Sequence, residues 1–407
     1  MKRKYTAFFI ILLAAMTSCA SEKPTVRPES DVPESRLDDF ITYDGPYMTA
    51  APEGYFAVNG SAMTGYFLYY ITPDFKKSTI VCNELECAHN DTDVQNHMEY
   101  LECNAYLTDA GANLDYYNGY LYIMMEDYTT SAGSKDILYR VSTDGTDKTV
   151  WYEPKQFVRG FCIYGDLACV AEEQLTAEGV KHSITTFPVE EPEKAKTIYE
   201  TSEYPNRTLN RMKCYGGNCY FYLYDPEQTL EGQQSVYLFV NLQTGEGRQL
   251  YEPASVWIEQ QDYGTLYEFK EYTSYRPETW NSTYYRSLSG SQEMQKLTEA
   301  DFLSVGEGDT LSGVDDRYIY FTSIHYGGNA LPAQEQKLRV YDYEGELTAE
   351  IPSGAFGEMY HVLPGTDRYL FVQKVNRDGS YAYYYVDKED FVGETAEAHE
   401  IPFDKKG

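Results

Sequence analysis

Residues Leu114–Tyr152 read LDYYNGYLYIMMEDYTTSAGSKDILYRVSTDGTDKTVWY, and they contain one complete unit of four short strands with its turns. Asn118-Gly119 is the strongest two-residue signal for a β-hairpin. Asp144-Gly145 marks a second tight turn. Around these turns aromatic and aliphatic residues alternate, which is typical of half-buried antiparallel strands. The predicted strands are Leu114–Tyr117, Tyr120–Met125, Ile137–Thr143 and Thr149–Tyr152.

The same order of strand, tight turn and strand recurs along the chain. Further turns between first and second strands are expected at Pro52-Glu53-Gly54, Gly165-Asp166, Gly216-Gly217, Tyr263-Gly264, Asp315-Asp316 and Gly365-Thr366-Asp367. From Gly119 onward these hairpins follow one another at intervals of about 50 residues, and a fixed period of this length indicates a repeat architecture. The sequence therefore predicts an all-β fold, a seven-bladed β-propeller, with six or eight blades as alternatives. Two stacked β-sandwiches fit less well, because no linker interrupts the chain midway.

Two segments resemble known proteins. The unit with NGYLY and LYRVSTDGTD resembles the low-density-lipoprotein-receptor-like propeller repeats of secreted bacterial proteins, although their YWTD tetrapeptide is absent. The segment with CxxxxCxH and CNAY resembles one in lipoproteins of anaerobic Gram-positive gut bacteria. The likeness covers most of the mature chain, and it implies a fold and an extracellular location rather than an activity.

The N-terminus has the pattern of a secretory signal peptide. Lys2, Arg3 and Lys4 precede an apolar run, Tyr5–Met16, that is too short for a membrane span of about 20 residues. The following residues up to Cys19 resemble the lipobox of bacterial lipoproteins, which implies that Cys19 is diacylated and anchors the mature chain. An ordinary secretory signal is the alternative.

The chain is thus divided into a signal peptide (1–18), a disordered tether (19–38) and the propeller (39–407). Proline, serine and acidic residues dominate the tether, which cannot bury enough apolar surface to order itself. We expect a lipid-anchored protein on the extracellular side of the cell membrane. The net charge of −31 makes nucleic acid a poor partner, because both would be polyanions.

The connections between second and third strands are predicted to be long and to lie on the face opposite the tight turns. Examples are EEQLTAEGVKH at 172–182 and KEYTSYRPETWNS at 270–282. Binding residues collect on loops that a rigid scaffold holds, so this face is the expected ligand surface. Its candidate contact residues are Tyr128, Tyr272, Tyr275, Trp280, His325 and Tyr326.

A Cys/His-rich insertion, 82–108, lies between the first unit and the second, and we expect it on the loop-rich face. Cys82, Cys87, His89 and Cys103 could complete a closed tetrahedral zinc site, although C-x4-C-x-H-x13-C is not a common finger spacing. The alternative is one disulfide, Cys87–Cys103 or Cys82–Cys103, with one thiol left over. His97 is a weaker candidate ligand. Either arrangement would be a structural cross-link that holds a long loop in place, and we expect no catalysis there.

The other cysteines face one another in predicted hairpins. Cys214 and Cys219 are opposed across a two-residue turn, at a separation that a disulfide can bridge. Cys162 and Cys169 are opposed one position farther from their turn, in a wider pair. Both pairs are candidate disulfides or buried free thiols.

No nucleophile elbow, P-loop, dinucleotide-binding fingerprint or HExxH motif occurs in the sequence. A non-enzymatic binding module for a glycan, a peptide or an envelope protein is therefore the favoured function. The alternatives are a carbohydrate-active enzyme, a glycoside hydrolase or polysaccharide lyase that uses paired carboxylates, and a non-catalytic subunit of an envelope complex. The only cofactor expected is the structural zinc.

Overall fold

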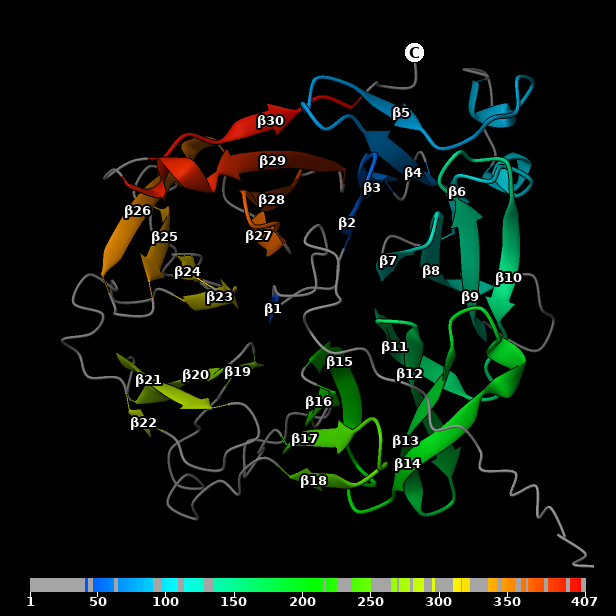
Figure 1. Cartoon of the computed structure of the whole chain (residues 1–407), viewed down its shortest axis with the longest axis vertical. Coiled ribbons are helices and arrows are strands. Elements are labelled where there is room, and N and C mark those ends of the chain that lie inside the picture. Colours follow the sequence, from blue (N-terminus) through cyan, green and yellow to red (C-terminus); the bar gives the residue numbers. More distant parts are fainter. Residues whose placement is uncertain are drawn as a thin grey trace, which may run out of the picture.

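The computed structural model describes residues 41–42, 47–61, 65–90, 97–108, 113–127, 135–215, 217–224, 236–249, 265–268, 271–278, 281–288, 295–296, 310–315, 317–322, 336–342, 346–355, 360–363, 365–376, 380–392 and 396–403. Its described strands form seven antiparallel sheets, each with four strands that follow one another in the chain, and β1 and β6 each add a fifth strand to one of them. The sheets stand around a common centre (Figure 1). The chain is an all-β propeller, as the sequence predicts, and the number of blades stays a prediction.

The unit on which the fold was predicted forms one sheet by itself. Its strands are β7 (Leu114–Tyr117), β8 (Tyr120–Asp127), β9 (Lys135–Ser142) and β10 (Lys148–Tyr152). Tyr117 pairs with Tyr120, so Asn118 and Gly119 make a two-residue turn. Both turn residues have positive φ, 47° and 85°, as a type I′ hairpin requires.

We number the sheets in chain order, so β7–β10 form the second sheet. The first comprises β2 (Met48–Ala51), β3 (Gly54–Ser61), β4 (Gly65–Ile71) and β5 (Ser78–Ile80), and the third β11 (Phe157–Tyr164), β12 (Leu167–Thr176), β13 (Gly179–Pro188) and β14 (Lys196–Thr201). The fourth comprises β15 (Thr208–Tyr215), β16 (Asn218–Tyr224), β17 (Val236–Asn241) and β18 (Gly247–Gln249).

The remaining sheets follow the same order. The fifth comprises β19 (Thr265–Glu268), β20 (Glu271–Glu278), β21 (Asn281–Leu288) and β22 (Gln295–Lys296), and the sixth β23 (Thr310–Val314), β24 (Tyr318–Thr322), β25 (Lys337–Asp342) and β26 (Leu347–Pro352). The seventh comprises β27 (Tyr360–Leu363), β28 (Tyr369–Val375), β29 (Tyr381–Asp387) and β30 (His399–Ile401). Short 3-10 turns η5 (Pro192–Lys194), η7 (Ser353–Ala355) and η8 (Lys388–Val392) occur between strands. No helix in the described part of the chain is long and apolar enough to cross a membrane.

The apolar core is divided among the gaps between neighbouring sheets. One cluster joins the second and third sheets and includes Tyr122, Trp151 and Phe161. Others join the first sheet to the second, the third to the fourth, and the sixth to the seventh. The first, second, third and seventh sheets therefore bury both faces, which explains why their strands are rich in large apolar residues.

The ring closes by packing rather than by a shared strand. The N-terminal strand β1 (Ile41–Thr42) pairs with β23 of the sixth sheet, not with the seventh. The first and seventh sheets instead meet through an apolar cluster that includes Phe75 and Phe371. The phenolic hydroxyl of Tyr383 also donates to the carbonyl of Val58 across this seam.

Two connections that the sequence predicts as long loops are mostly strand. Within 172–182, β12 continues to Thr176 and β13 begins at Gly179. Within 270–282, β20 ends at Glu278 and β21 begins at Asn281. Both segments contain residues that strands favour, Val180 in the first and Tyr272, Thr273 and Tyr275 in the second, and such residues extend a strand as readily as they occur in a loop.

Candidate metal centre

The Cys/His-rich insertion begins and ends on the first sheet. It leaves after β5, forms the short turns η3 (Ala88–Asn90) and η4 (His97–Tyr100), and returns as β6 (Tyr106–Leu107). In β6, Tyr106 and Leu107 pair with Phe67 and Tyr66 of β4. Because β5 pairs with the other end of β4, the two short strands fix both ends of the insertion.

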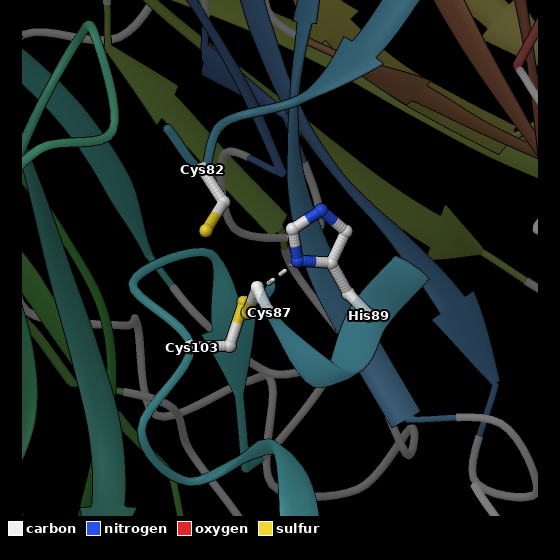
Figure 2. Close-up of side chains that lie close together, drawn as sticks. All are labelled: Cys82, Cys87, His89 and Cys103. Carbon is white, nitrogen blue, oxygen red and sulfur yellow. Dashed lines mark hydrogen bonds between the residues drawn. The ribbon is translucent and has the colours of Figure 1, made fainter. Parts of the chain in front are cut away.

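The insertion brings together the four side chains that the sequence selects. One donor atom from each of Cys82, Cys87, His89 and Cys103 lies within 4.8 Å of all the others. Figure 2 shows the side chains converging on one point. Cys103 Sγ is 3.5 Å from His89 Nδ1, and zinc bond lengths place sulfur and nitrogen ligands about 3.5 Å apart at a tetrahedral ion. Three sulfurs and one imidazole nitrogen are a standard structural zinc set.

Local turns hold these side chains in place. The amide of Asn90 donates to the carbonyl of Cys87 at 2.9 Å, and that of Cys103 donates to Tyr100 at 2.8 Å. Cys87, His89 and Cys103 are buried, and Cys82 is half-buried. The site is thus largely shielded from solvent.

Gly145 of the second sheet supports the site from outside. It lies in the β9–β10 turn with φ +73°, and a Cβ there would lie 2.7 Å from Cys82 Cα. Its carbonyl accepts hydrogen bonds from the Asn83 amide at 3.3 Å and from Asn104 Nδ2 at 3.0 Å. The insertion therefore packs against a tight turn between third and fourth strands. The sequence predicts the insertion on the face of the long loops, and this prediction leaves out the contact with the β9–β10 turn. The contact arises because the insertion follows the outer strand of the first sheet, which lies next to the second sheet.

The charge balance of the site involves a lysine that the sequence did not reveal. Burial raises the pKa of the Cys82 and Cys103 thiols. Lys148 Nζ donates to the Tyr106 carbonyl at 2.6 Å. Burial lowers the pKa of Lys148 to about 8, while its interaction with Cys103 acts in the opposite direction. A divalent ion with three thiolates carries one net negative charge, and the Lys148 ammonium would balance it.

No pattern near Lys148 in the sequence marks it as part of the site. It becomes recognisable only once the β9–β10 turn is known to pack on the insertion.

Of the other predicted site residues, some lie where the sequence predicts them, two lie in a strand instead of a loop, and several are outside the described part of the chain. Cys162 pairs with Cys169 across β11 and β12, and Cys214 with Cys219 across β15 and β16, as predicted. None of these cysteines, nor those of the insertion, forms a disulfide in the described part of the chain. Tyr272 and Tyr275 belong to strand β20 rather than to a loop. Cys19, Tyr128, Trp280, His325 and Tyr326, and the side chain of His97, lie outside the described part of the chain.

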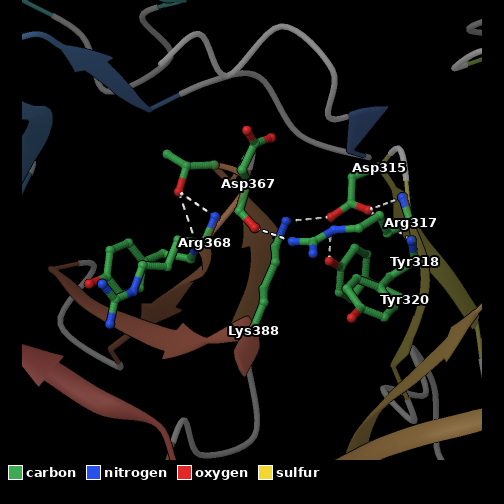
Figure 3. Close-up of polar contacts among 9 residues, drawn as sticks. Asp315, Arg317, Tyr318, Tyr320, Asp367, Arg368 and Lys388 are labelled. Atoms are coloured by element: carbon green, nitrogen blue, oxygen red, sulfur yellow. Dashed lines mark hydrogen bonds and ion pairs between the residues drawn. The ribbon is translucent and has the colours of Figure 1, made fainter. Parts of the chain in front are cut away.

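A hollow of about 370 Å³ lies at the seam between the first and seventh sheets. Its walls include Pro52, Tyr55, Pro73, Thr366, Asp367 and Arg368. Figure 3 shows Asp367 and Arg368 beside the polar contacts of Asp315 and Lys388. Burial raises the pKa of Tyr55 to about 12. The hollow opens beside turns between first and second strands, which is the face that the sequence did not select for binding.

Comparisons with known proteins bear on the fold alone. No protein-family model matches the chain, and no curated protein matches its sequence. A puromycin-hydrolyzing peptidase of Mycobacterium tuberculosis matches 90% of this chain with a TM-score of 0.53 and 9% identity. The match covers 54% of the peptidase, so this chain spans about half of its length.

Two further structures are similar. An oligogalacturonate lyase from Vibrio parahaemolyticus matches 86% of this chain and 92% of its own, with a TM-score of 0.50 and 11% identity. The β-propeller domain of the Trilobed protease from Pyrococcus furiosus matches 71% of this chain and 82% of its own, with a TM-score of 0.47 and 11% identity. At these identities the shared property is the propeller scaffold.

Proposed function

We propose that this protein is a lipid-anchored extracellular propeller that acts as a binding module, and that its insertion holds one structural zinc ion. The observation that supports the zinc site is the convergence of Cys82, Cys87, His89 and Cys103 within 4.8 Å. Four protein ligands leave no open position for a water molecule, which a catalytic zinc needs. The ion therefore stabilises the scaffold and takes no part in a reaction.

The zinc would connect two neighbouring sheets. Cys82 follows β5 of the first sheet, and its backbone contacts Gly145 of the second. The described part of the insertion contains only two short 3-10 turns and a two-residue strand, so a cross-link would help to offset the entropy cost of ordering it. One ion would add a cross-link to the apolar contacts that Tyr100, Tyr106 and Leu107 already make in the core.

Metal content tests this part of the proposal. Purified protein should contain about one equivalent of zinc, and His89→Ala should lose most of it because one ligand is missing. His361→Ala, which removes a histidine of β27 far from the insertion, should keep the metal. Metal-free wild-type protein that also takes up no added zinc would refute the site.

The seam hollow is a described surface that suits a ligand. Tyr55 and two prolines provide flat apolar walls, while Asp367 and Arg368 provide polar groups at the edge. Pockets with this combination orient small ligands through a few polar contacts. We favour a glycan as the ligand, and a peptide is the alternative.

An oligosaccharide array with the purified protein tests binding, and product analysis on any hit separates a binder from a carbohydrate-active enzyme. Tyr55→Ala should abolish binding of the hit. Phe157→Ala, which removes a 46% exposed ring on the third sheet, should not. Binding that survives Tyr55→Ala would place the ligand elsewhere, and release of shortened sugars would show an enzyme.

Membrane anchoring rests on Cys19 and has its own test. Cys19→Ser in a bacterial host should move the protein from the membrane fraction to the soluble fraction, because the acylated thiol is lost. An unchanged membrane fraction would reject the anchor.

A further inference from the structure

A second group of thiols lies between the third and fourth sheets. The sulfur atoms of Cys162 on β11, Cys169 on β12 and Cys214 on β15 lie within 4.8 Å of one another. Cys162 and Cys169 are cross-strand neighbours, and β15 packs against both of their strands. Two sheets thus contribute to one cluster, although the sequence predicts a separate pair within each hairpin.

We infer that Cys162, Cys169 and Cys214 form a three-coordinate site for a soft monovalent metal ion, Cu(I). The donor set consists of sulfur alone, and soft thiolate ligands select Cu(I) over harder ions. Zinc prefers four ligands, and the insertion supplies such a set. The chain therefore carries two thiol sites that differ in the number and kind of their donor atoms.

The surroundings favour an ion of low charge. The cluster is packed among Leu167, Ile184, Leu209 and Phe221 in the core between the sheets. Burying a net charge in such a place is costly. When Cu(I) binds, one thiol loses its proton and the other two coordinate as neutral thiols, so the complex has no net charge and the copper keeps its oxidation state. A divalent ion would have to displace two protons to give a neutral complex.

A nearby carboxylate adds to this preference. Asp115 Oδ2 accepts a hydrogen bond from the amide of Ile163 at 2.8 Å, next to Cys162 in the chain. A complex with a net negative charge would be repelled by this group. The neutral complex of a monovalent ion avoids the repulsion.

Cys162 provides the route by which an ion reaches the cluster. Cys169 and Cys214 are buried, but Cys162 is only half-buried. The ion can bind first at Cys162 and then exchange onto the other two sulfurs. Cys219, which pairs with Cys214 across the hairpin and is fully buried, is not part of the group of three.

That difference supplies a matched pair of variants. The purified full-length protein, loaded with zinc, is titrated anaerobically with Cu(I) in ascorbate against the chromophoric chelator bicinchoninate. We expect wild type and Cys219→Ser to take about one equivalent of Cu(I) more than Cys214→Ser, with zinc content unchanged in all three. X-ray absorption of the copper-loaded protein should show a shell of three sulfurs.

Should Cys214→Ser fail to fold, Cys162→Ser gives the same comparison at a half-buried position. Equal copper binding by Cys214→Ser and wild type, or copper bound only with loss of zinc, would overturn the inference. So would peptide mapping of the untreated protein that finds Cys162–Cys169 or Cys214–Cys219 as a disulfide.

Discussion

At the scale of single residues, a buried ion pair joins Asp315 and Lys388. Lys388 Nζ lies 2.6 Å from Asp315 Oδ2, and the two side chains are 2% and 4% exposed (Figure 3). Asp315 also accepts hydrogen bonds from the Tyr320 hydroxyl and from the amides of Arg317 and Tyr318. The carboxylate is thereby fully satisfied, and it joins the sixth sheet to η8 of the seventh.

Loss of Lys388 should strongly destabilise the fold. Lys388→Met leaves a buried carboxylate without its counter-ion, which costs about 3–5 kcal/mol. The unfolding midpoint in urea measures the loss. Lys76→Met breaks an ion pair with Asp74 whose side chains are 82% and 56% exposed, and it should leave the midpoint unchanged. Equal midpoints for the two variants would show that the buried pair does not hold these sheets together.

Glu173 gives the fold a dependence on pH. Burial raises the pKa of Glu173, but hydrogen bonds from His182, from the Leu209 amide and from Arg159 outweigh it and hold the pKa below its usual range. A carboxylate with a lowered pKa in the folded state contributes stability above the usual glutamate pKa. That contribution is lost as the pH falls through the lowered value.

The third sheet and β15 of the fourth should therefore loosen in acid. Glu173→Gln should lower the unfolding midpoint at neutral pH, and its difference from wild type should shrink as the pH falls through the lowered pKa. Thermal unfolding over a pH series measures this. Glu178→Gln, at an exposed turn, serves as the control with no pH-dependent difference. A Glu173→Gln difference that stays constant with pH would contradict the argument.

At the scale of elements, two hairpin glycines with similar backbone angles have different surroundings. Gly145 has φ +73° and its Cβ position is 2.7 Å from Cys82, whereas Gly119 has φ +85° and nothing within 4 Å of its Cβ position. The first glycine is required by a close approach of two sheets, and the second only by its turn.

Alanine substitution at each glycine should distinguish the close approach of two sheets at Gly145 from the turn conformation at Gly119. Gly145→Ala should displace Cys82 and weaken zinc binding about 10-fold or more, as changes beside metal ligands commonly do. Gly119→Ala should strain its turn and leave zinc affinity unchanged. Competition with a chromophoric zinc chelator measures both. Equal zinc affinities in the two variants would mean that Gly145 does not position the site.

The sequence predicts elements well where local signals decide them. Asn118-Gly119 and the opposed pair Cys214/Cys219 lie where turn chemistry and strand alternation place them. The four ligands of the insertion could be selected because their residue types are rare and clustered. By contrast, the sequence predicts Tyr272 in a loop although it lies in β20, because aromatic residues separated by polar ones fit a strand end and a loop equally.

Contacts between sheets were beyond prediction for a physical reason. They depend on how far each blade is rotated against the next, and no local pattern encodes that rotation. Lys148 beside Cys103 and Cys214 beside Cys162 both result from it. Sequence reasoning therefore found the ligands of the insertion but missed its counter-ion and the thiol cluster between sheets.

At the scale of the whole molecule, closure of the ring depends on side chains at one seam. Phe75 stacks on Tyr55 of the first sheet with ring centroids 4.9 Å apart and on Tyr385 of the seventh at 4.2 Å. It also meets Phe371 edge-on at 5.9 Å. Because β1 joins the sixth sheet, no hydrogen-bonded strand pair closes the described ring between its first and last sheets. The seam is therefore where the propeller should open first.

Phe75→Ala tests this expectation. Removal of the ring leaves a cavity in the seam and should cost about 3–5 kcal/mol. Hydrogen exchange should then speed up in 48–80 and 360–403 together while 157–224 stays protected, because the first and last sheets separate before the others unfold. Phe161→Ala, which removes a buried ring between the second and third sheets, should instead expose 114–188. If both variants exchanged uniformly along the chain, the seam would be no weaker than any other gap, and the ring would unfold as a single cooperative unit.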